Sequence, residues 1–129
     1  MNEVPIKGEK SSFRFRRQEH LKGRDEIREV FKGRRFGCRG AKLFMLKNNL
    51  PHNRICFTFS RGFGTAVERN RARRLAREAY RLMQPKLSGG NDLILLMYPE
   101  TPPDNVRKMA LSGRMEQLES LFTKAGLLK

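Results

Sequence analysis

The stretch TAVERNRARRLAREAYRLM, residues 65–83, constrains the fold most because it carries two opposite characters along one predicted helix. At about 100° per residue, its apolar side chains fall within one arc of roughly 120°. These are Ala72, Leu75, Ala76, Ala79, Leu82 and Met83. The opposite arc holds Arg69, Asn70, Arg73, Arg74, Arg77, Tyr80 and Arg81, with Arg71 near the border. The pattern predicts a helix that packs its alanine-rich side on a core and exposes its arginines.

The arginine-rich side favours a polyanion as its ligand. The stretch contains six arginines and no lysine, and within the helix only Glu68 and Glu78 oppose that charge. Guanidinium is planar, permanently charged and able to form two parallel hydrogen bonds with phosphate. A merely solvated helix face usually mixes charges of both signs, and a membrane-surface helix needs larger apolar residues than alanine. Nucleic-acid binding therefore explains this stretch better than either alternative.

The charge of the whole chain agrees with a polyanionic partner. Lysine and arginine together number 28 against 13 acidic residues, which gives a net charge of +15. Such an excess favours nucleic acid or an acidic membrane. No apolar run is long enough to span a bilayer, and the first residues lack the apolar core of a signal peptide. We therefore expect a cytoplasmic protein with no membrane partner.

The chain length of 129 residues suggests one domain, which we expect over 21–129 after a flexible basic arm over 1–20. Phe13 and Phe15 of the arm alternate with arginines, and either a solvated tail or a nucleic-acid contact accounts for them. Cys38 and Cys56 are expected to be free thiols. Together with two distant histidines they provide no metal-ligand spacing.

The remaining elements follow from hydrophobic periodicity. We expect a helix over 24–32, strands over 41–46, 54–60 and 92–98, and a last helix from Asp104 or Asn105 to about Lys124. The run over 92–98 is unbroken and apolar, which is typical of a strand covered on both faces. This order predicts a two-layer α+β sandwich. If the strands before and after the basic helix are parallel neighbours, that helix is the crossover between them.

Small side chains alternate with large ones in the 54–60 strand. Cys56, Thr58 and Ser60 lie on one face, and Ile55, Phe57 and Phe59 lie on the other. In the 41–46 strand, Lys42 and Phe44 share a face. Small residues beside an aromatic ring and a cation suit a single nucleic-acid strand, although an ordinary solvated sheet face explains the pattern equally well.

Nothing in the sequence indicates that the protein alone performs catalysis. The acidic residues form no cluster typical of a two-metal phosphodiesterase. No pair of histidines or of histidine and lysine suggests metal-free ribonuclease chemistry. The glycines of RGFG, residues 61–64, do not fit a phosphate-binding loop of the GxxxxGK[ST] type. The residues themselves thus indicate a nucleic-acid-binding module, for RNA or for DNA.

The stretch RICFTFSRGFGTAVERNRARRLAREAYR, residues 54–81, resembles the protein subunit of bacterial ribonuclease P. The family's RNR signature corresponds to Arg69-Asn70-Arg71, followed by Arg73-Arg74 and Arg77-Glu78. LKGRDEIREVFK (21–32) is similar to the family's first helix, and DLILLMYP (92–99) to its late strand. The resemblance covers residues 21 to about 124.

This resemblance implies an α/β sandwich with a small, mostly antiparallel sheet and a left-handed βαβ crossover that carries the RNR helix. A right-handed crossover would otherwise be expected. It also implies a subunit that binds the ribonuclease P RNA and the single-stranded 5′ leader of precursor tRNA, and so promotes endonucleolytic removal of the leader. Catalysis and the Mg²⁺ ions would belong to the RNA, and no obligate protein partner is expected. The alternative function is a non-catalytic RNA-binding module of ribosomal or RNA-chaperone type.

The resemblance and the sheet pattern together assign site residues. The expected RNA-binding residues are Arg61, Arg69, Asn70, Arg71, Arg73, Arg74, Arg77 and Arg81. The expected residues of the leader-binding cleft are Phe31, Lys42, Phe44, Thr58 and Ser60. No catalytic residue and no metal ligand are expected in the protein. The chain departs from the family at Ile27, where an aromatic residue is usual, and at Gly62, where a second lysine often stands.

Overall fold

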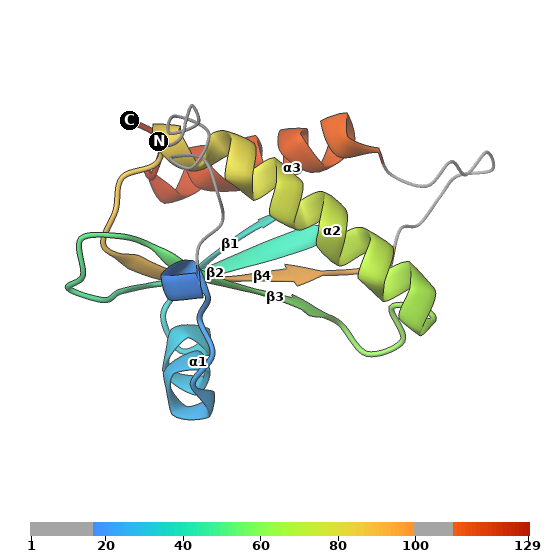
Figure 1. The fold of residues 1–129 in the computed structure, drawn as a ribbon, viewed down its shortest axis with the longest axis horizontal. Helices are drawn as coiled ribbons and strands as arrows, with labels where there is room; N and C mark the ends of the chain where they lie inside the picture. The colour runs from blue at the N-terminus through green and yellow to red at the C-terminus, as the bar shows by residue number, and fades with distance from the viewer. Residues whose placement is uncertain (1–16, 100–109) are drawn as a thin grey trace.

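The computed structural model of the chain describes residues 17–99 and 110–129. Its elements are η2 (Arg17–Glu19), α1 (Arg24–Phe31), β1 (Arg34–Cys38), β2 (Ala41–Lys47), β3 (Arg54–Phe59), α2 (Ala66–Met83), η3 (Gln84–Lys86), β4 (Asn91–Met97) and α3 (Leu111–Ala125). One sheet lies in the middle, α2 and α3 cover one of its faces, and α1 lies on the other (Figure 1). The predicted α+β sandwich is confirmed, with α1 as an addition on the second face.

The sheet has the strand order β1-β2-β4-β3. β2 pairs antiparallel with β1 and with β4, whereas β3 pairs parallel with β4. The predicted strands over 41–46, 54–60 and 92–98 are confirmed within one residue at each end. β4 lies between β2 and β3, so the two strands that flank the turn at residues 48–53 are not neighbours. Burial on both faces of β4 follows from this central place.

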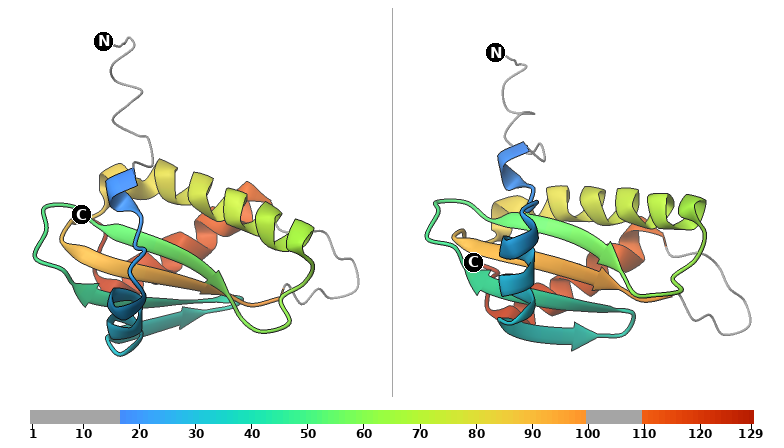
Figure 2. Two further views of the ribbon diagram at one scale, coloured as in Figure 1. Left: turned by 60° about the horizontal axis from the view of Figure 1, so that its bottom comes forward. Right: turned by 90° about the horizontal axis from the view of Figure 1, so that it is seen from below.

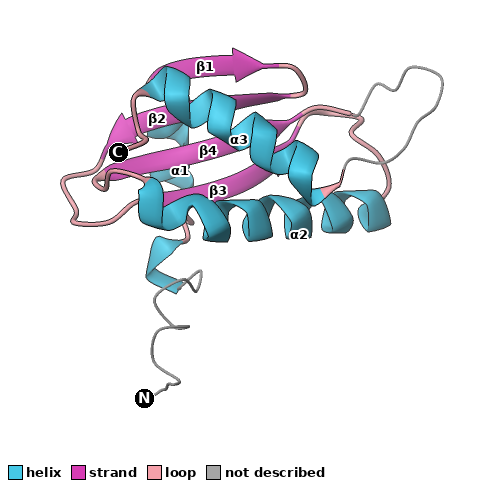
Figure 3. Ribbon diagram, turned by 90° about the horizontal axis from the view of Figure 1, so that it is seen from above, coloured by secondary structure: helices cyan, strands magenta, loops and turns pink. Residues whose placement is uncertain are grey.

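The connection from β3 through α2 to β4 is a left-handed crossover. In Figure 3, α2 and α3 lie in front of the sheet, β3 and β4 both run toward the right, and β4 lies on the far side of β3 from α2. With the strands pointing upward and the helix in front, β4 is therefore to the left of β3. This confirms the handedness that the family resemblance implies, against the strong general preference for right-handed crossovers.

A capping box starts α2. The Thr65 hydroxyl accepts a hydrogen bond from the Glu68 amide at 3.1 Å, and the Glu68 carboxylate accepts one from the Thr65 amide at 2.8 Å. Two amides that the first turn leaves unpaired are thereby satisfied. The negative charge of Glu68 also complements the helix N-terminus. The start of the arginine-rich helix is thus fixed locally.

The buried side of α2 is rotated from the predicted arc. Ala72, Ala76, Ala79 and Met83 are buried as expected, but Leu82 is 39% exposed and Tyr80, predicted on the polar side, is buried. The Tyr80 ring packs edge-on against Phe57 of β3 and Phe122 of α3, each with its centroid 6.3 Å away. The prediction was wrong at these two residues because α3 covers that flank of α2.

The main core fills the space between the sheet and the two helices α2 and α3. Leu43, Leu93, Leu95 and Met97 are fully buried there, as are Leu118, Leu121 and Phe122 of the last helix. The residues Asp104 and Asn105, where that helix was predicted to begin, lie outside the described residues, but Ala110 has an extended backbone and α3 begins only at Leu111, so the predicted helix was too long at its start. α3 ends at Gly126, whose φ of 74° is a left-handed conformation that glycine adopts readily.

A smaller core lies under α1. Leu21, Val30, Phe44 and Ile94 are buried in it, and Ile27 packs against them. The helix predicted over 24–32 is confirmed as α1, which buries this face as its periodicity requires. This second cluster positions α1 on the face of the sheet that carries the predicted leader-binding residues.

The end of the predicted arm is part of the fold. Glu19 is buried, and His20 forms an isolated parallel β-bridge with Ile55. The Leu21 amide donates a hydrogen bond to the Ile55 carbonyl at 3.0 Å. Figure 2 shows this segment running past β3 before it enters α1. The folded part therefore begins before residue 21. The earlier part of the arm, with Phe13 and Phe15, lies outside the described residues.

Candidate nucleic-acid interface

Residues of three strands meet on the side of the sheet that carries α1, which we call the α1 face. The pairing places Phe44, Ile94 and Cys56 in one cross-strand row. Lys42, Leu96 and Thr58 form the next row. Because alternate residues share a face, the side chains predicted for leader binding on β2 and β3 lie on one surface with β4 between them.

An aromatic pair stands where α1 meets this face. The rings of Phe31 and Phe44 have centroids 4.9 Å apart and an interplanar angle of 66°. The Phe31 residue is 40% exposed, whereas Phe44 is only 6% exposed. Of these two rings, only that of Phe31 is therefore accessible to a nucleobase. The Phe44 ring lies beneath it and supports it. Direct stacking on Phe44, as its place in the predicted leader cleft suggests, does not fit this burial.

Tyr98 is a residue of this face that the sequence analysis missed. It continues the alternation of Ile94 and Leu96 one step beyond β4, and its amide donates to the Gly40 carbonyl at 3.0 Å. The Lys42 ammonium lies 5.8 Å from the centroid of the Tyr98 ring. The two-residue alternation along the apolar run over 92–98 could have revealed it. Lys42 and Tyr98 place a cation and an aromatic ring side by side.

The other predicted residues at the end of β3 differ in accessibility. Thr58 is half-buried in its row, and the Ser60 amide donates to the Met97 carbonyl at 2.9 Å. The Ser60 hydroxyl oxygen is buried, and within the described part of the chain it has no hydrogen-bond partner. Arg61 is exposed, and Gly62 follows with a φ of 78°. This conformation is unfavourable for a side-chain-bearing residue, which gives a physical reason for the departure at Gly62.

The arginines of α2 form the second part of the interface. Arg74 and Arg77 are exposed, together with Asn70, while Arg69, Arg71, Arg73 and Arg81 are half-buried. The Arg73 guanidinium lies 5.1 Å from the centroid of the Phe59 ring and donates to the Asn70 side-chain oxygen at 3.0 Å. Arg69 donates to the Gly64 carbonyl at 2.7 Å. These contacts hold the guanidinium groups of Arg69 and Arg73 in place in the N-terminal half of α2.

Arg81 differs from the other predicted RNA-binding residues. It donates two hydrogen bonds to the Glu78 carboxylate, at 2.6 and 3.0 Å. These bonds raise the pKa of Arg81 and lower the pKa of Glu78 relative to their usual values. A carboxylate thus already occupies donors that a phosphate would need. We therefore expect Arg81 to contribute less to RNA binding than Arg73, Arg74 or Arg77.

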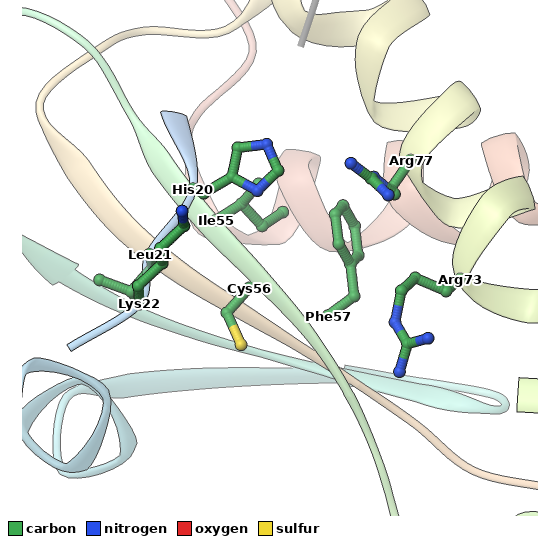
Figure 4. A pocket seen from close by; sticks show the side chains of 8 residues that line it. All are labelled: His20, Leu21, Lys22, Ile55, Cys56, Phe57, Arg73 and Arg77. Carbon is green, nitrogen blue, oxygen red and sulfur yellow. The ribbon is translucent and has the colours of Figure 1, made fainter. Parts of the chain in front are cut away.

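A pocket of about 180 Å³ lies between β3 of the sheet and the arginines of α2. It is lined by His20, Leu21, Lys22, Ile55, Cys56, Phe57, Arg73 and Arg77 (Figure 4). Arg73 and Arg77 approach it from α2, and Lys22 belongs to the segment that leads into α1. Burial raises the pKa of the Cys56 thiol above its usual value, so this thiol is neutral at physiological pH. The charge in the pocket comes from its basic side chains.

An ion-pair network anchors α1 beside this surface. Arg54 donates to both oxygens of Asp92, at 2.7 and 2.6 Å, and lies 3.4 Å from a Glu26 oxygen of α1. Asp92 is 5% exposed and also accepts a hydrogen bond from the side-chain amide nitrogen of Asn48 at 2.8 Å. The hydrogen bonding that Arg54 donates to Asp92 is the main cause that raises the pKa of Arg54. The network ties the helix that bears Phe31 to the sheet.

The described residues contain no group of three or more histidine, cysteine or acidic side chains that could hold a metal ion. Within the same part of the chain, no helix has the length and apolar character needed to cross a membrane. The guanidinium, ammonium and aromatic groups of this surface are suited to the recognition of phosphate and of unpaired bases.

The family model described as ribonuclease P matches residues 15–126. This chain belongs to the ribonuclease P protein family. The ribonuclease P protein component of Natranaerobius thermophilus is 43% identical over 77 residues, which cover 59% of this chain and 67% of that protein. The component of Exiguobacterium sp. is 31% identical over 112 residues, which cover 86% and 93%. The resemblance carried by residues 54–81 is thus confirmed.

Two solved structures show the same fold. The ribonuclease P protein of Staphylococcus aureus superimposes with a TM-score of 0.71 at 19% identity, covering 86% of this chain and 98% of that one. The protein of Thermotoga maritima gives a TM-score of 0.66 at 22% identity, covering 79% and 93%. As a ribonuclease P protein component, the chain works with the ribonuclease P RNA, which carries the catalysis, in the 5′ maturation of tRNA.

Proposed function

We propose that the α1 face binds the single-stranded 5′ leader of precursor tRNA, while the arginines of α2 bind the ribonuclease P RNA. The observation that carries this proposal is the continuity of the two surfaces. β3 supplies Thr58 and Ser60 to the α1 face, and the chain then passes through Arg61 directly into α2. A ribonuclease P RNA bound to the arginines of α2 would thus lie beside the 5′ leader of a precursor tRNA bound on the α1 face.

Along the α1 face, the leader would meet first an aromatic ring on which a base can stack and then a cationic side chain. A leader base stacks on the exposed Phe31 ring, which Phe44 supports. Lys42 lies one row farther along the sheet, and Tyr98 and Ser60 lie about one row beyond it. Two residues along a strand span about 7 Å, so the surface from Phe44 to Tyr98 extends about 13 Å. A short single-stranded segment fits this length.

The arginines neutralise RNA phosphates and leave metal chemistry to the RNA. Arg61, Arg69, Asn70, Arg71, Arg73, Arg74 and Arg77 form this contact, with a smaller share from Arg81. Neutralised phosphates lower the repulsion between the RNA subunit and its substrate. Mg²⁺ would then be bound by the RNA subunit and the substrate. We place this activity in the cytoplasm, carried by one domain over 21–129 to which the end of the basic arm docks.

Substitution of Phe31 tests the leader assignment. Phe31→Ala is expected to weaken binding of leader-bearing precursor tRNA to the holoenzyme by roughly 1 to 3 kcal/mol, because a base loses its stacking partner. Binding of mature tRNA should stay unchanged. Leu50→Ala is the matched control, since Leu50 is 37% exposed against 40% for Phe31 and lies in the turn before β3. Equal losses for both RNAs would instead support a general RNA-binding module.

Reconstitution tests the division of labour. Cleavage of precursor tRNA at low Mg²⁺ is measured with a bacterial ribonuclease P RNA, with the protein, and with both. We expect cleavage with both together and none with the protein alone. If the protein cleaved without RNA, the placement of all catalysis on the RNA would be wrong.

A further inference from the structure

A second group of arginines lies at the opposite edge of the sheet from α2. β1 is an edge strand that pairs only with β2, and it begins with Arg34 and Arg35. Arg39 follows directly after it. All three residues are exposed. Figure 3 shows β1 and α2 at opposite edges of the molecule, with the width of the sheet between them. We call Arg34, Arg35 and Arg39 the β1 arginines.

The β1 arginines point to different sides of their edge. The Arg34 guanidinium lies 5.0 Å from the centroid of the Phe36 ring, on the face that α3 covers. Arg35 is paired directly opposite Phe44 in the antiparallel register, so its side chain lies on the α1 face. The backbone of Arg39 is held by a 2.8 Å hydrogen bond from the Gln117 side chain to its carbonyl. Together they border the edge along its whole length.

No carboxylate neutralises this group within the described residues. The ion pairs recorded there involve Arg28, Lys32, Arg54 and Arg81, and none involves a β1 arginine. Three guanidinium groups without lysine, and without a paired acid, are suited to phosphate oxygens. Arg34 is in addition held on an aromatic ring, which lowers the entropy that it loses on binding.

We propose that the β1 arginines form a second phosphate-binding surface for an RNA backbone, on the far side of the α1 face from α2. This inference rests on the proposed function of the α1 face. The leader would then lie between two basic borders, with Arg35 next to the Phe31 and Phe44 pair. The backbone bound there is that of the precursor tRNA, because Arg35 is paired opposite Phe44 on the α1 face, where the leader is proposed to bind.

Protection of a free strand edge is the competing explanation, because charged side chains at an edge prevent pairing with another chain. Lysine or glutamate would serve that purpose as well as arginine. The two explanations differ in their consequences. Loss of protection produces association of the protein with itself, whereas loss of a phosphate-binding surface weakens RNA binding and lowers its salt dependence.

The test is the triple variant Arg34→Gln, Arg35→Gln and Arg39→Gln in the full chain. Its binding to ribonuclease P RNA, and the binding of precursor tRNA to its holoenzyme, are measured over a range of salt concentrations. We expect a loss of about tenfold or more in the affinity for precursor tRNA and a decrease of about 2 to 3 in the slope of log K against log salt, near 0.7 to 0.9 per phosphate contact. A loss confined to the affinity for ribonuclease P RNA would overturn the assignment to precursor tRNA.

A charge-matched control separates local contact from overall charge. Arg24, Lys86 and Lys129 are exposed and belong neither to β1 nor to its partner strand β2, and their replacement by glutamine removes the same three charges. Equal losses in the two triple variants would overturn the proposal. Wild-type affinity for both RNAs, with or without new self-association in sedimentation, would overturn it as well. An Arg73→Gln variant that also bound RNA normally would show that the proposed function itself is wrong.

Discussion

The contact between Phe31 and Phe44 allows a test of how the α1 face recognises a base. Phe44 is almost fully buried, so it can influence a bound leader only through the ring above it. Phe44→Leu keeps an apolar side chain of similar size but removes the edge-to-face contact. The variant should therefore weaken leader binding only while Phe31 is present. A double-mutant cycle with Phe31→Ala measures this dependence.

The expected magnitudes follow from the geometry. An edge-to-face pair contributes about 0.5 to 1.5 kcal/mol beyond its buried area, which bounds the effect of Phe44→Leu on the placement of Phe31. The smaller core under α1 also loses packing, at a cost of up to about 1.5 kcal/mol in the free energy of unfolding. For a chain of this size, each 1 kcal/mol corresponds to a decrease of about 4 °C in Tm.

Fluorescence anisotropy of a 5′-labelled precursor tRNA gives the affinity of each holoenzyme in the cycle, and thermal unfolding gives the stability of each free protein. We expect Phe44→Leu to lower leader affinity by about 2- to 10-fold in the wild-type background. In the Phe31→Ala background it should have no further effect. An equal loss in both backgrounds would show that a base reaches Phe44 directly, and the support role would be refuted.

Two further predictions concern stability. Thr65→Ala removes the hydroxyl that accepts a hydrogen bond from the Glu68 amide, and should lower the free energy of unfolding by about 1 kcal/mol in urea titrations, whereas Thr123→Ala on the exposed side of α3 should change it by less than about 0.5 kcal/mol. Burial raises the pKa of Tyr80 far above its usual value, so the folded state holds this proton more tightly than the unfolded chain. The free energy of unfolding should therefore fall as the pH rises above about 10, the usual tyrosine pKa. In a Tyr98→Phe variant, phenolate absorbance should appear only as the protein unfolds, and its appearance in the folded protein would contradict the burial of Tyr80.

The elements that the sequence predicted well are those with a strong local pattern. α2 has an alanine stripe, an arginine stripe and the Thr65 cap, and each of these is encoded within a few residues. β4 is an unbroken apolar run, which is what a central strand requires. For both elements, local preference and tertiary environment favour the same structure.

β1 escaped prediction because its structure depends on distant partners. The segment RRFGC has two arginines and a glycine among five residues, and none of these favours a strand strongly. It becomes a strand because β2 supplies a pairing partner, while Phe36 and Cys38 pack against the main core. The order of the strands is likewise invisible locally, since no residue of β2 or β3 specifies that β4 lies between them.

The same distinction applies to the interface. The arginines of α2 could be recognised from their spacing, and the family signature adds the expectation that they bind RNA. The burial of Phe44 under α1 and the turn of Tyr80 toward α3 depend on contacts between elements far apart in the chain. Tyr98 was missed because the run over 92–98 is apolar throughout, so its pattern does not separate the face that carries α1 from the face toward the main core.

The central position of β4 determines when this protein can first bind RNA during its synthesis. β2 and β3 have no partner in common until residues 91–97 have left the ribosome, because β4 joins them. α2 is complete earlier, but its like-charged arginines repel one another and its alanines have no sheet to cover. The arginine-rich helix α2 is therefore translated well before it can be stably folded. A nascent chain that ends before Asn91 exposes many positive charges without the geometry to place them, and specific assembly with the RNA must wait for the last quarter of the protein.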